Sequence, residues 1–352
     1  MNPRVCKFGG SSLADADGFR RVRRIIDADS SRKYIVVSAP GRSASEGEKV
    51  TDLLLRAQQA EGDARHAILT RAFKRYTSIR AALDIDCDLE AEFDRIEHAN
   101  APSPAALISR GEYLCARLFA AYCGMEFVDA RDLIIFDADG AADVKMTLRA
   151  AQRLKHLSHL SGVVIPGFYG AAPDGEIALF SRGGSDVSGA LIAAAFAPCL
   201  YENWTDVDGL YSADPRLVPD ARLHLRAGFT QTAALSACGA QVLHPDSLIF
   251  LRGRGVAVQL RNSFDPTCPG TRVSEAFDEL HLPCVALRRE GLQGGCGAAV
   301  ISIFGLAPER LSALREAISP LRCEEKGDHI ELFIYERAGA EALRAAHRAL
   351  ME

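Results

Sequence analysis

The first forty residues alternate strand-length apolar runs with a helical pattern, and this alternation limits the fold more than any other feature of the chain. Residues 4–8 and 34–39 (YIVVSA) are short apolar runs typical of buried strands. Between them, residues 15–29 have helical spacing, and their apolar side chains share one face: Phe19, Val22, Ile25 and Ile26. A β-α-β unit of this kind predicts an α/β fold with a parallel sheet covered on both faces.

The alternation continues along the chain and then changes. Helical patterns cover residues 51–60, 64–83, 109–122 and 186–195, and strand-like runs cover 126–129 and 162–166. Residues 264–280 (FDPTCPGTRVSEAFDEL) interrupt this order with two prolines, a glycine and several charges. We therefore expect one domain over residues 1–275 and a second over residues 280–352.

The second region reads as a small α/β module. Its predicted strands are 285–288, 298–304 and 329–335, and its predicted helices are 308–318 and 340–350. The alternating run 329–335 (HIELFIY) is expected to form an exposed edge strand that pairs with its counterpart in a homodimer.

Composition excludes several classes of partner. The formal net charge of −5 and the pI near 6.0 argue against nucleic acid or an anionic membrane as the main partner. Ten cysteines are present without a C-x-x-C pair, which is typical of reduced thiols in a cytoplasmic protein rather than of a disulfide framework. No apolar run is long enough to span a membrane. Small molecules are the expected ligands.

Three glycine-containing or polar stretches are candidates for a ligand site. Residues 5–12 (VCKFGGSS) place Lys7 and a glycine turn between a strand and a helix, which suits phosphate but equally describes a tight turn with a surface lysine. Residues 180–189 (FSRGGSDVSG) place Arg182 before a second glycine pair and Asp186 after it, where Asp186 could also be a plain helix cap. Residues 201–215 (YENWTDVDGLYSADP) form a polar loop after a strand-like run.

Together with other blocks, these stretches resemble the aspartate kinases of the amino-acid kinase family. The matching blocks, in order, are K-F-G-G-S-S, V-V-S-A with V-T-D-L-L, S-R-G-E, I-P-G-F-Y-G, S-R-G-G-S-D, W-T-D-V-D-G-L-Y-S-A-D-P-R and G-A-Q-V-L-H-P. The resemblance implies a three-layer sandwich with a mainly parallel central sheet, followed by a small ACT-like regulatory or dimerisation domain that is shortened relative to the family. It also implies ATP-dependent phosphorylation of the side-chain carboxylate of L-aspartate, the first step of the aspartate-derived amino-acid pathway, with Mg²⁺ accompanying ATP.

The resemblance also implies roles for single residues. Lys7 is expected to stabilise the transferred phosphoryl group, and Asp186 to organise the site around it. The residues expected to bind the substrate are Ser38, Thr51, Glu112, Arg182 and Ser185, with Arg182 on a carboxylate and Glu112 on the α-ammonium group. The residues expected to bind the nucleotide are Gly9, Gly10, Ser11, Thr205, Asp206, Tyr211, Arg216, Gln241 and Val242.

Departures from the family pattern leave two alternatives open beside an aspartate kinase. Gln241 stands where many relatives have lysine, which removes a positive charge from the expected phosphate region. Together with the shortened C-terminal module, it favours a weakly catalytic regulatory paralogue. The longer, more polar linker at residues 40–49 (PGRSASEGEK) favours a kinase for another amino-acid or carboxylate acceptor. Without the resemblance, Glu112 would be read as a solvated carboxylate near a helix start.

Overall fold

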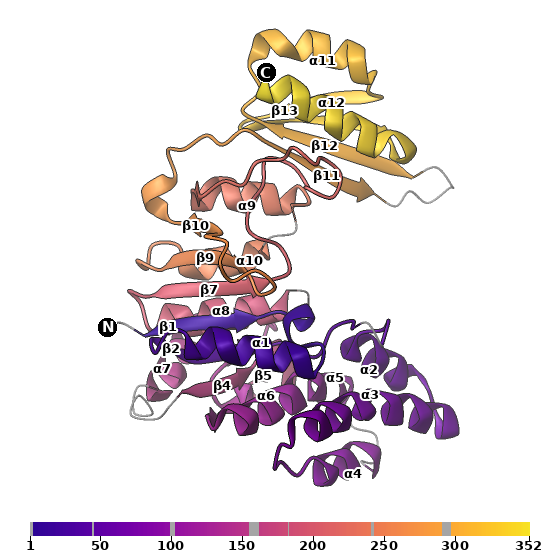
Figure 1. The fold of residues 1–352 in the computed structure, drawn as a ribbon, viewed down its shortest axis with the longest axis vertical. Coiled ribbons are helices and arrows are strands. Elements are labelled where there is room, and N and C mark those ends of the chain that lie inside the picture. Colours follow the sequence, from indigo (N-terminus) through magenta and orange to yellow (C-terminus); the bar gives the residue numbers. More distant parts are fainter. Residues whose placement is uncertain are drawn as a thin grey trace. The chain divides into compact units, whose positions relative to one another are not determined.

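The computed structural model describes residues 3–43, 46–98, 103–154, 162–181, 183–240, 243–290 and 297–352. The chain divides into two compact units (Figure 1). The first unit comprises Met1–Val207 and Asp246–Cys268, and the second comprises Asp208–Pro245 and Pro269–Glu352.

A parallel sheet forms the centre of the first unit. Six of its strands follow the order β3-β4-β2-β1-β7-β9, and all neighbouring strands in this order are parallel. Their bounds are β1 (Arg4–Phe8), β2 (Arg32–Val37), β3 (Glu126–Phe127), β4 (Val163–Pro166), β7 (Leu200–Thr205) and β9 (Ala257–Asn262). A separate antiparallel pair consists of β5 (Tyr169–Ala171) and β6 (Ile177–Leu179).

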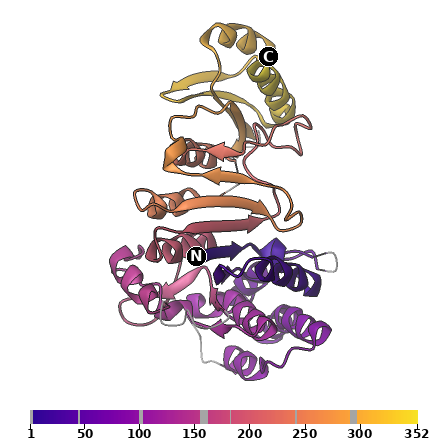
Figure 2. The same cartoon turned by 60° about the vertical axis from the view of Figure 1, so that its left-hand side comes forward.

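Helices cover both faces of this sheet (Figures 1 and 2). The helices are α1 (Ala16–Asp27), α2 (Val50–Gln59), α3 (Gly62–Leu83), α4 (Glu90–His98), α5 (Pro104–Ile108), α6 (Arg110–Cys123), α7 (Val144–Gln152), α8 (Gly184–Ala195) and α10 (Pro245–Leu251), with 3-10 turns η1 (Gly10–Leu13) and η2 (Ala130–Asp132). Cys6 and Phe8 pack in one core with α1 and α6, whereas Tyr34 stacks on Phe196 at the end of α8 with ring centroids 4.0 Å apart. Helix, sheet and helix form the predicted three-layer sandwich. None of the described helices is both long and apolar enough to cross a membrane.

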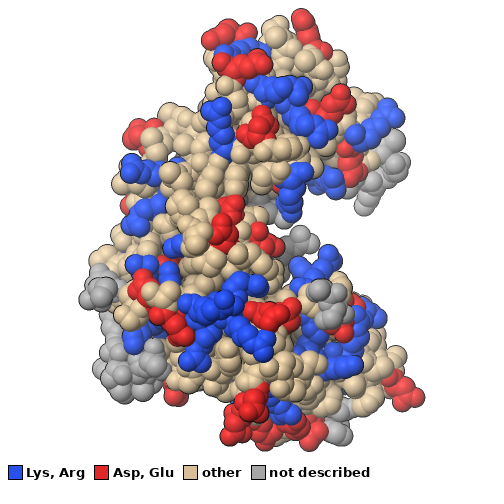
Figure 3. All heavy atoms as spheres, viewed as in Figure 1, with Lys and Arg blue, Asp and Glu red and all other residues tan. Residues whose placement is uncertain are grey.

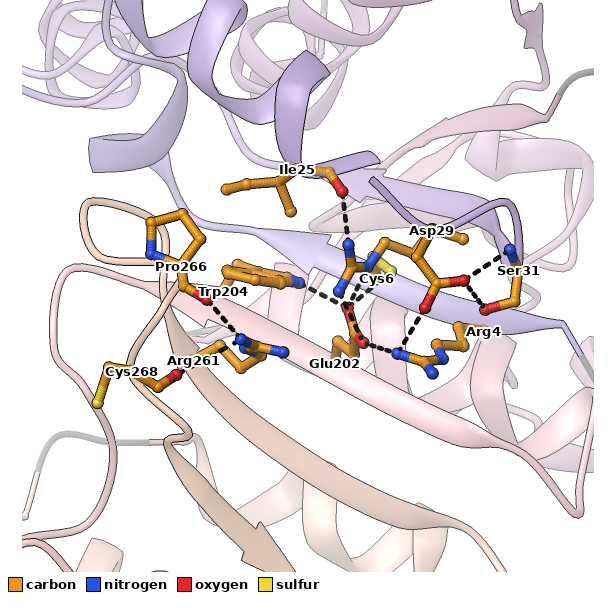
Figure 4. Close-up of polar contacts among 11 residues, drawn as sticks. Arg4, Cys6, Ile25, Asp29, Ser31, Glu202, Trp204, Arg261, Pro266 and Cys268 are labelled. Carbon is orange, nitrogen blue, oxygen red and sulfur yellow. Dashed lines mark hydrogen bonds and ion pairs between the residues drawn. The ribbon is translucent and has the colours of Figure 1, made fainter. Parts of the chain in front are cut away.

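A buried carboxylate ties three strands of this sheet together (Figure 4). Glu202 on β7 is fully buried and accepts hydrogen bonds from Arg32 Nε at 2.8 Å, Arg4 at 2.7 Å and Trp204 Nε1 at 2.9 Å. Arg4 also pairs with Asp29 at 3.0 Å. Burial alone would raise the pKa of Glu202, but its hydrogen bonds and the nearby arginine charges outweigh burial and hold that pKa below its usual value. The charge is thus compensated inside the core.

The arginines of residues 20–24 (RRVRR) lie on the solvated side of α1. Phe19, Val22, Ile25 and Ile26 are all buried. On the outer side, Arg20 pairs with Asp17 at 2.7 Å and Arg23 pairs with Asp27 at 3.1 Å. Over the face on which α1 lies, Figure 3 shows a group of blue side chains bordered by red ones. Such mixed charge is typical of a solvated surface.

An antiparallel sheet in the order β11-β12-β14-β13 organises the second unit. The elements of this unit are β8 (Arg226–Ala227), α9 (Phe229–Ala237), β10 (Thr271–Val273), η4 (Glu275–Phe277), β11 (Cys284–Glu290), β12 (Ala298–Phe304), η5 (Pro308–Arg310), α11 (Leu311–Ile318), β13 (Arg322–Lys326), β14 (His329–Tyr335), η6 (Glu336–Ala338) and α12 (Gly339–Met351). Leu314 of α11 and Leu343 of α12 share one core with Ile301 and Leu332 of the sheet. This arrangement fits the predicted ACT-like module.

The expectation for the alternating run 329–335 is wrong in one respect. It forms a strand, β14, but β14 pairs with β12 on one side and with β13 on the other. It is therefore an inner strand, and its backbone is not an edge that a second chain could extend. The missed partner, β13 (RCEEK), is mostly charged and lacks the alternation of apolar residues that identifies a strand.

Candidate active site

The carboxyl ends of parallel strands bring the first site residues to one edge of the sheet. In the register of β1, Lys7 lies level with Val36 of β2 and with Asn203 of β7. Residues that are level in parallel strands point to the same face. Lys7 and Asn203 therefore both point toward the face that α8 covers.

Lys7 and Asp186 form an ion pair at this edge. Lys7 Nζ lies 2.7 Å from Asp186 Oδ1, with side chains 10% and 17% exposed. Asn203 Nδ2 donates to the same oxygen at 2.8 Å, and the Tyr201 hydroxyl donates to the Asp186 carbonyl at 3.3 Å. Asp186 sits in the first turn of α8, after Gly183 in the left-handed conformation (φ 61°). The interpretation of Asp186 as a plain helix cap is wrong, because Gly183 is the N-cap residue of α8 and the Asp186 side chain pairs with Lys7 instead.

The glycine turn after β1 is built for close backbone approach. A side chain at Gly10 would place its Cβ 2.7 Å from the Ala39 carbonyl oxygen. The Gly41 N–H donates to the Gly10 carbonyl oxygen at 2.9 Å. A Cβ at Gly9 would lie 3.6 Å from Lys7 Nζ, so Gly9 lies beside the ammonium group. Ser11 follows in η1 and is half-buried.

The resemblance places Gly9 among the nucleotide-binding residues, but its backbone N–H already has a partner. The Gly9 N–H donates to the Trp204 carbonyl at 3.0 Å, so it is not free to bind a phosphate. The tight pairing of β1 with β7 extends one residue beyond the strand and uses this donor. Gly9 can therefore favour ligand binding only by leaving free the space that a side chain would occupy.

Glu112 is a buried carboxyl group with an unsatisfied oxygen. It lies in the first turn of α6 and is 4% exposed. Burial raises the pKa of Glu112 to about 8, although hydrogen bonds from backbone N–H groups, that of Ala39 among them, oppose the shift. Its Oε2 has no hydrogen-bond partner among the described residues. The solvated-carboxylate reading is therefore wrong, and the environment suits a cation that would pair with Glu112.

The three predicted hydroxyl donors lie on elements next to Glu112 and Asp186. Ser38 follows β2, and its N–H donates to the Phe8 carbonyl at 3.2 Å. Thr51 is half-buried in the first turn of α2. Ser185 precedes Asp186 on α8, and a Cβ at Gly167 would lie 2.8 Å from its Oγ. Gly167 follows β4, and its N–H donates to the Val37 carbonyl at 2.9 Å, so Ser185 lies close to the end of β2.

The predicted nucleotide residues fall in both units. Thr205 ends β7, and its hydroxyl donates to the exposed Asp206 at 3.1 Å in the first unit. In the second unit, the Tyr211 hydroxyl donates to Asp208 at 2.5 Å, and Arg216 pairs with Asp214 at 2.8 Å. Three further predicted site residues lie outside the residues that the structure describes: Arg182, Gln241 and Val242.

Asn203 is a candidate functional residue that the sequence motifs did not identify. Its amide donates to Asp186 and is level with Lys7, so it fixes the carboxylate against the lysine. One signal was present in the sequence, because Asn203 is an amide within the strand-like run that precedes Thr205 and Asp206. A buried amide in a strand needs a partner, and here the partner is in the site.

Comparison with known proteins gives a consistent result. The model of the amino acid kinase family matches residues 2–262. Aspartokinase 3 of Bacillus subtilis is 33% identical over 302 residues, which are 81% of this chain and 66% of the relative. Lysine-sensitive aspartokinase 3 of Escherichia coli is 31% identical over 310 residues, which cover 81% of this chain and 67% of the relative. The chain thus spans about two thirds of the length of these curated relatives.

Solved structures resemble the chain over nearly its whole length. The crystal structure of aspartate kinase from Clostridium acetobutylicum matches with a TM-score of 0.83 and 26% identity, covering 99% of this chain and 100% of that one. The structure of E. coli aspartokinase III in complex with aspartate and ADP matches with a TM-score of 0.73 and 25% identity. The match covers 99% of this chain and 84% of that one.

Proposed function

Because the chain belongs to the amino acid kinase family, we propose that it transfers the γ-phosphoryl group of ATP to the side-chain carboxylate of L-aspartate. The product is 4-phospho-L-aspartate, and the reaction would open the aspartate-derived amino-acid pathway. An aspartate side chain is ionised at neutral pH, since its reference pKa is about 3.9. Its oxygen forms the new bond to the γ-phosphorus while the bond to the β,γ-bridging oxygen breaks and ADP leaves. No proton is transferred, so positioning and charge carry the catalysis.

The observation that carries this proposal is the Lys7–Asp186 ion pair beside the glycine turn. Lys7 supplies fixed positive charge where the transferred phosphoryl group becomes most negative. Asp186 holds the ammonium group through an ion pair of 2.7 Å, and Asn203 holds Asp186 through a hydrogen bond of 2.8 Å. Gly9 leaves room for a phosphate oxygen next to Lys7, because it has no side chain.

Glu112 supports an amino acid as the acceptor. An α-ammonium group would pair with the buried carboxylate and give its unsatisfied Oε2 a partner. Ser38, Thr51 and Ser185 would donate hydrogen bonds to the substrate's carboxylates, and Arg182 would bind one of them bidentately. E. coli aspartokinase III, the structural relative with aspartate bound, supports this substrate.

The nucleotide would contact the glycine turn and the loops after β7. We assign Gly10, Ser11, Thr205, Asp206, Tyr211 and Arg216 to it, together with Gln241 and Val242. Mg²⁺ would accompany the phosphates of ATP. Among the described residues of the first unit, no three side chains of metal-binding type converge, so phosphate oxygens and water would supply most of its ligands.

The domain boundary near residues 275–280, the homodimer and the cytoplasmic location are also proposals. The dimer is tested by the mass measured with light scattering after size exclusion. With β14 inside its sheet, a dimer through the second unit would use side-chain faces or the edge strands β11 and β13.

The activity is tested by hydroxamate formation from L-aspartate, MgATP and hydroxylamine, because acyl phosphates react with hydroxylamine and phosphate esters do not. Glutamate, N-acetylglutamate and homoserine serve as competing acceptors. We expect a signal with aspartate that Lys7→Ala lowers by about 10²–10³-fold. Lys145→Ala is the matched control, since Lys145 is exposed on α7. Folded protein that binds ATP but gives no signal with aspartate would refute the assignment and favour another acceptor or a regulatory role.

A further inference from the structure

Three side chains of metal-binding type converge in the second unit. Cys238 Sγ lies 3.6 Å from His329 Nε2, and His329 Nε2 lies 3.8 Å from Glu331 Oε1. One ligand atom from each residue lies within 4.8 Å of the others. Cys238 and Glu331 are buried, and His329 is half-buried. They are the only such group among the residues that the structure describes.

The fold explains why these residues meet. His329 and Glu331 are two residues apart on β14, so both side chains point away from the core that α11 and α12 cover. Cys238 caps the end of α9, and Gly239, with a φ of 106°, turns the chain there. A Cβ at Gly239 would lie 2.9 Å from the Leu287 carbonyl oxygen, so the end of α9 lies directly on the sheet.

His329 is oriented as a metal-binding histidine is. Its Nδ1 lies 2.7 Å from Asp328 Oδ1. A carboxylate only accepts hydrogen bonds, so this contact assigns the proton to Nδ1 and leaves the lone pair of the neutral ring on Nε2, toward Cys238. Histidine ligands commonly donate their second nitrogen to a carboxylate in this way. Phe304 stacks on the ring with centroids 4.6 Å apart and fixes its plane.

The distances fit a tetrahedral zinc ion. Zn–S and Zn–N bonds of about 2.3 and 2.0–2.1 Å at a tetrahedral angle separate sulfur and nitrogen by about 3.6 Å. The observed separation of Cys238 Sγ and His329 Nε2 is 3.6 Å. The 3.8 Å from His329 Nε2 to Glu331 Oε1 requires a small movement of the Glu331 side chain, since the same geometry gives about 3.3 Å.

The surroundings add an oxygen atom to the group. Ser302 is level with Glu331 across β12 and β14 and is fully buried. Its hydroxyl lies within hydrogen-bonding reach of the Cys238 thiol, so a further possible ligand borders the three side chains. Arg288 lies 3.6 Å from Glu331 Oε1. Its positive charge and the negative charge of Asp328 offset each other next to the three candidate ligands.

We propose that Cys238, His329 and Glu331 bind a divalent transition-metal ion of the Zn²⁺ class. Water or the Ser302 hydroxyl completes four-coordination. Mixed sulfur, nitrogen and oxygen ligands select such an ion over Mg²⁺ or Ca²⁺, which take oxygen ligands. Binding converts the Cys238 thiol to a thiolate and releases its proton to solvent. The ion fastens the end of α9 to β14. This proposal does not depend on the kinase activity.

Cobalt titration of the full, reduced chain after chelator treatment tests the site. We expect one equivalent of Co²⁺ to give the visible bands of a four-coordinate ion and a thiolate-to-cobalt charge-transfer band, both abolished by added Zn²⁺. Cys238→Ser should remove the charge-transfer band. Asp328→Asn should weaken Co²⁺ binding by about 10–100-fold, because it removes the carboxylate that orients His329.

Cys323→Ser is the matched control, because Cys323 lies on β13 level with Leu332 and packs against the core. It should leave the spectrum unchanged. Folded wild-type chain without the bands, or bands that persist in Cys238→Ser, would overturn the proposal. If Cys238→Ser does not fold, the Co²⁺ affinities of Asp328→Asn and Glu331→Gln provide the test. An affinity for Co²⁺ equal to that of wild type in both variants would also overturn the proposal. None of these readouts needs kinase activity.

Discussion

Lys7 at the end of β1 and Asp186 in the first turn of α8 form an ion pair of 2.7 Å. The pair connects a strand of the sheet to the helix that covers it, and Asn203 on the neighbouring strand holds its carboxylate. A charge fixed in this way does not have to reorganise when a phosphoryl group approaches, which is the physical basis of electrostatic preorganisation.

Asn203→Ala is expected to lower kcat by about 10–100-fold, the value of a lost hydrogen bond to a charged group. The KM for aspartate should stay nearly unchanged, because Asn203 positions Asp186 and is not expected to touch aspartate. Steady-state kinetics separate the two parameters. Asn203→Ser retains a donor and should recover part of the rate. A raised KM with an unchanged kcat would contradict the positioning role.

Aspartate binding near pH 7 is expected to release a proton. With a pKa of about 8, the Glu112 carboxyl is largely neutral in the free protein, whereas an α-ammonium group would pair with its ionised form. Aspartate affinity should therefore rise between pH 6 and about pH 8. Calorimetry in buffers of different ionisation enthalpy measures the released proton. Glu112→Gln should weaken binding and abolish the release, whereas a wild-type binding enthalpy that is the same in all buffers would exclude this linkage.

Glu112 should also make the stability of the ligand-free protein depend on pH. Its pKa lies above the reference value of 4.5, so between about pH 4.5 and 8 the folded state binds more protons than the unfolded state. Its contribution to the free energy of unfolding is therefore fully present below pH 4.5 and is lost as pH rises through about 8. Urea midpoints measured for wild type and Glu112→Gln should converge at low pH and diverge toward pH 8, with the variant more stable there.

Gly10→Ala is expected to impair both folding and activity, because its Cβ would lie 2.7 Å from the backbone oxygen of Ala39. Overpacking of this kind costs about 1–3 kcal/mol. Gly47→Ala is the control, since its Cβ would meet nothing within 4 Å. Denaturant midpoints and hydroxamate rates of the two variants test the expectation. Equal effects would mean that the glycine turn does not depend on close approach.

Glu202→Gln is expected to lower the free energy of unfolding by about 3–5 kcal/mol, because it leaves the Arg32 charge buried without a counter-charge. Asp29→Asn, at a carboxylate that is 24% exposed, should cost about 1 kcal/mol or less. Urea denaturation monitored by Trp204 fluorescence measures both. A small effect of Glu202→Gln would indicate that the arginines reach water instead.

Several elements could be predicted because their signals are local. The helix α1 follows from the spacing of Phe19, Val22, Ile25 and Ile26, and β12 was predicted with its observed bounds, Ala298–Phe304. The charged strand β13 was missed, because it is held by pairing with β14 rather than by its own pattern. The position of β14 inside the sheet could not be predicted from its alternating apolar residues. Alternation shows which side chains lie on each face of a strand, but not which strands pair with it.

Local sequence thus predicted the parallel α/β class and the glycine turns, because hydrogen-bonding periodicity and turn geometry act over a few residues. The roles expected of Lys7 and Asp186 came instead from the resemblance of several sequence blocks to the amino-acid kinase family. The three-dimensional fold was needed to bring Asn203 against Asp186, to bury Glu112 and raise its pKa, and to place Cys238 beside His329, 91 residues away. Those relationships depend on strand register and helix docking, which the packing of the whole core selects and no short segment encodes.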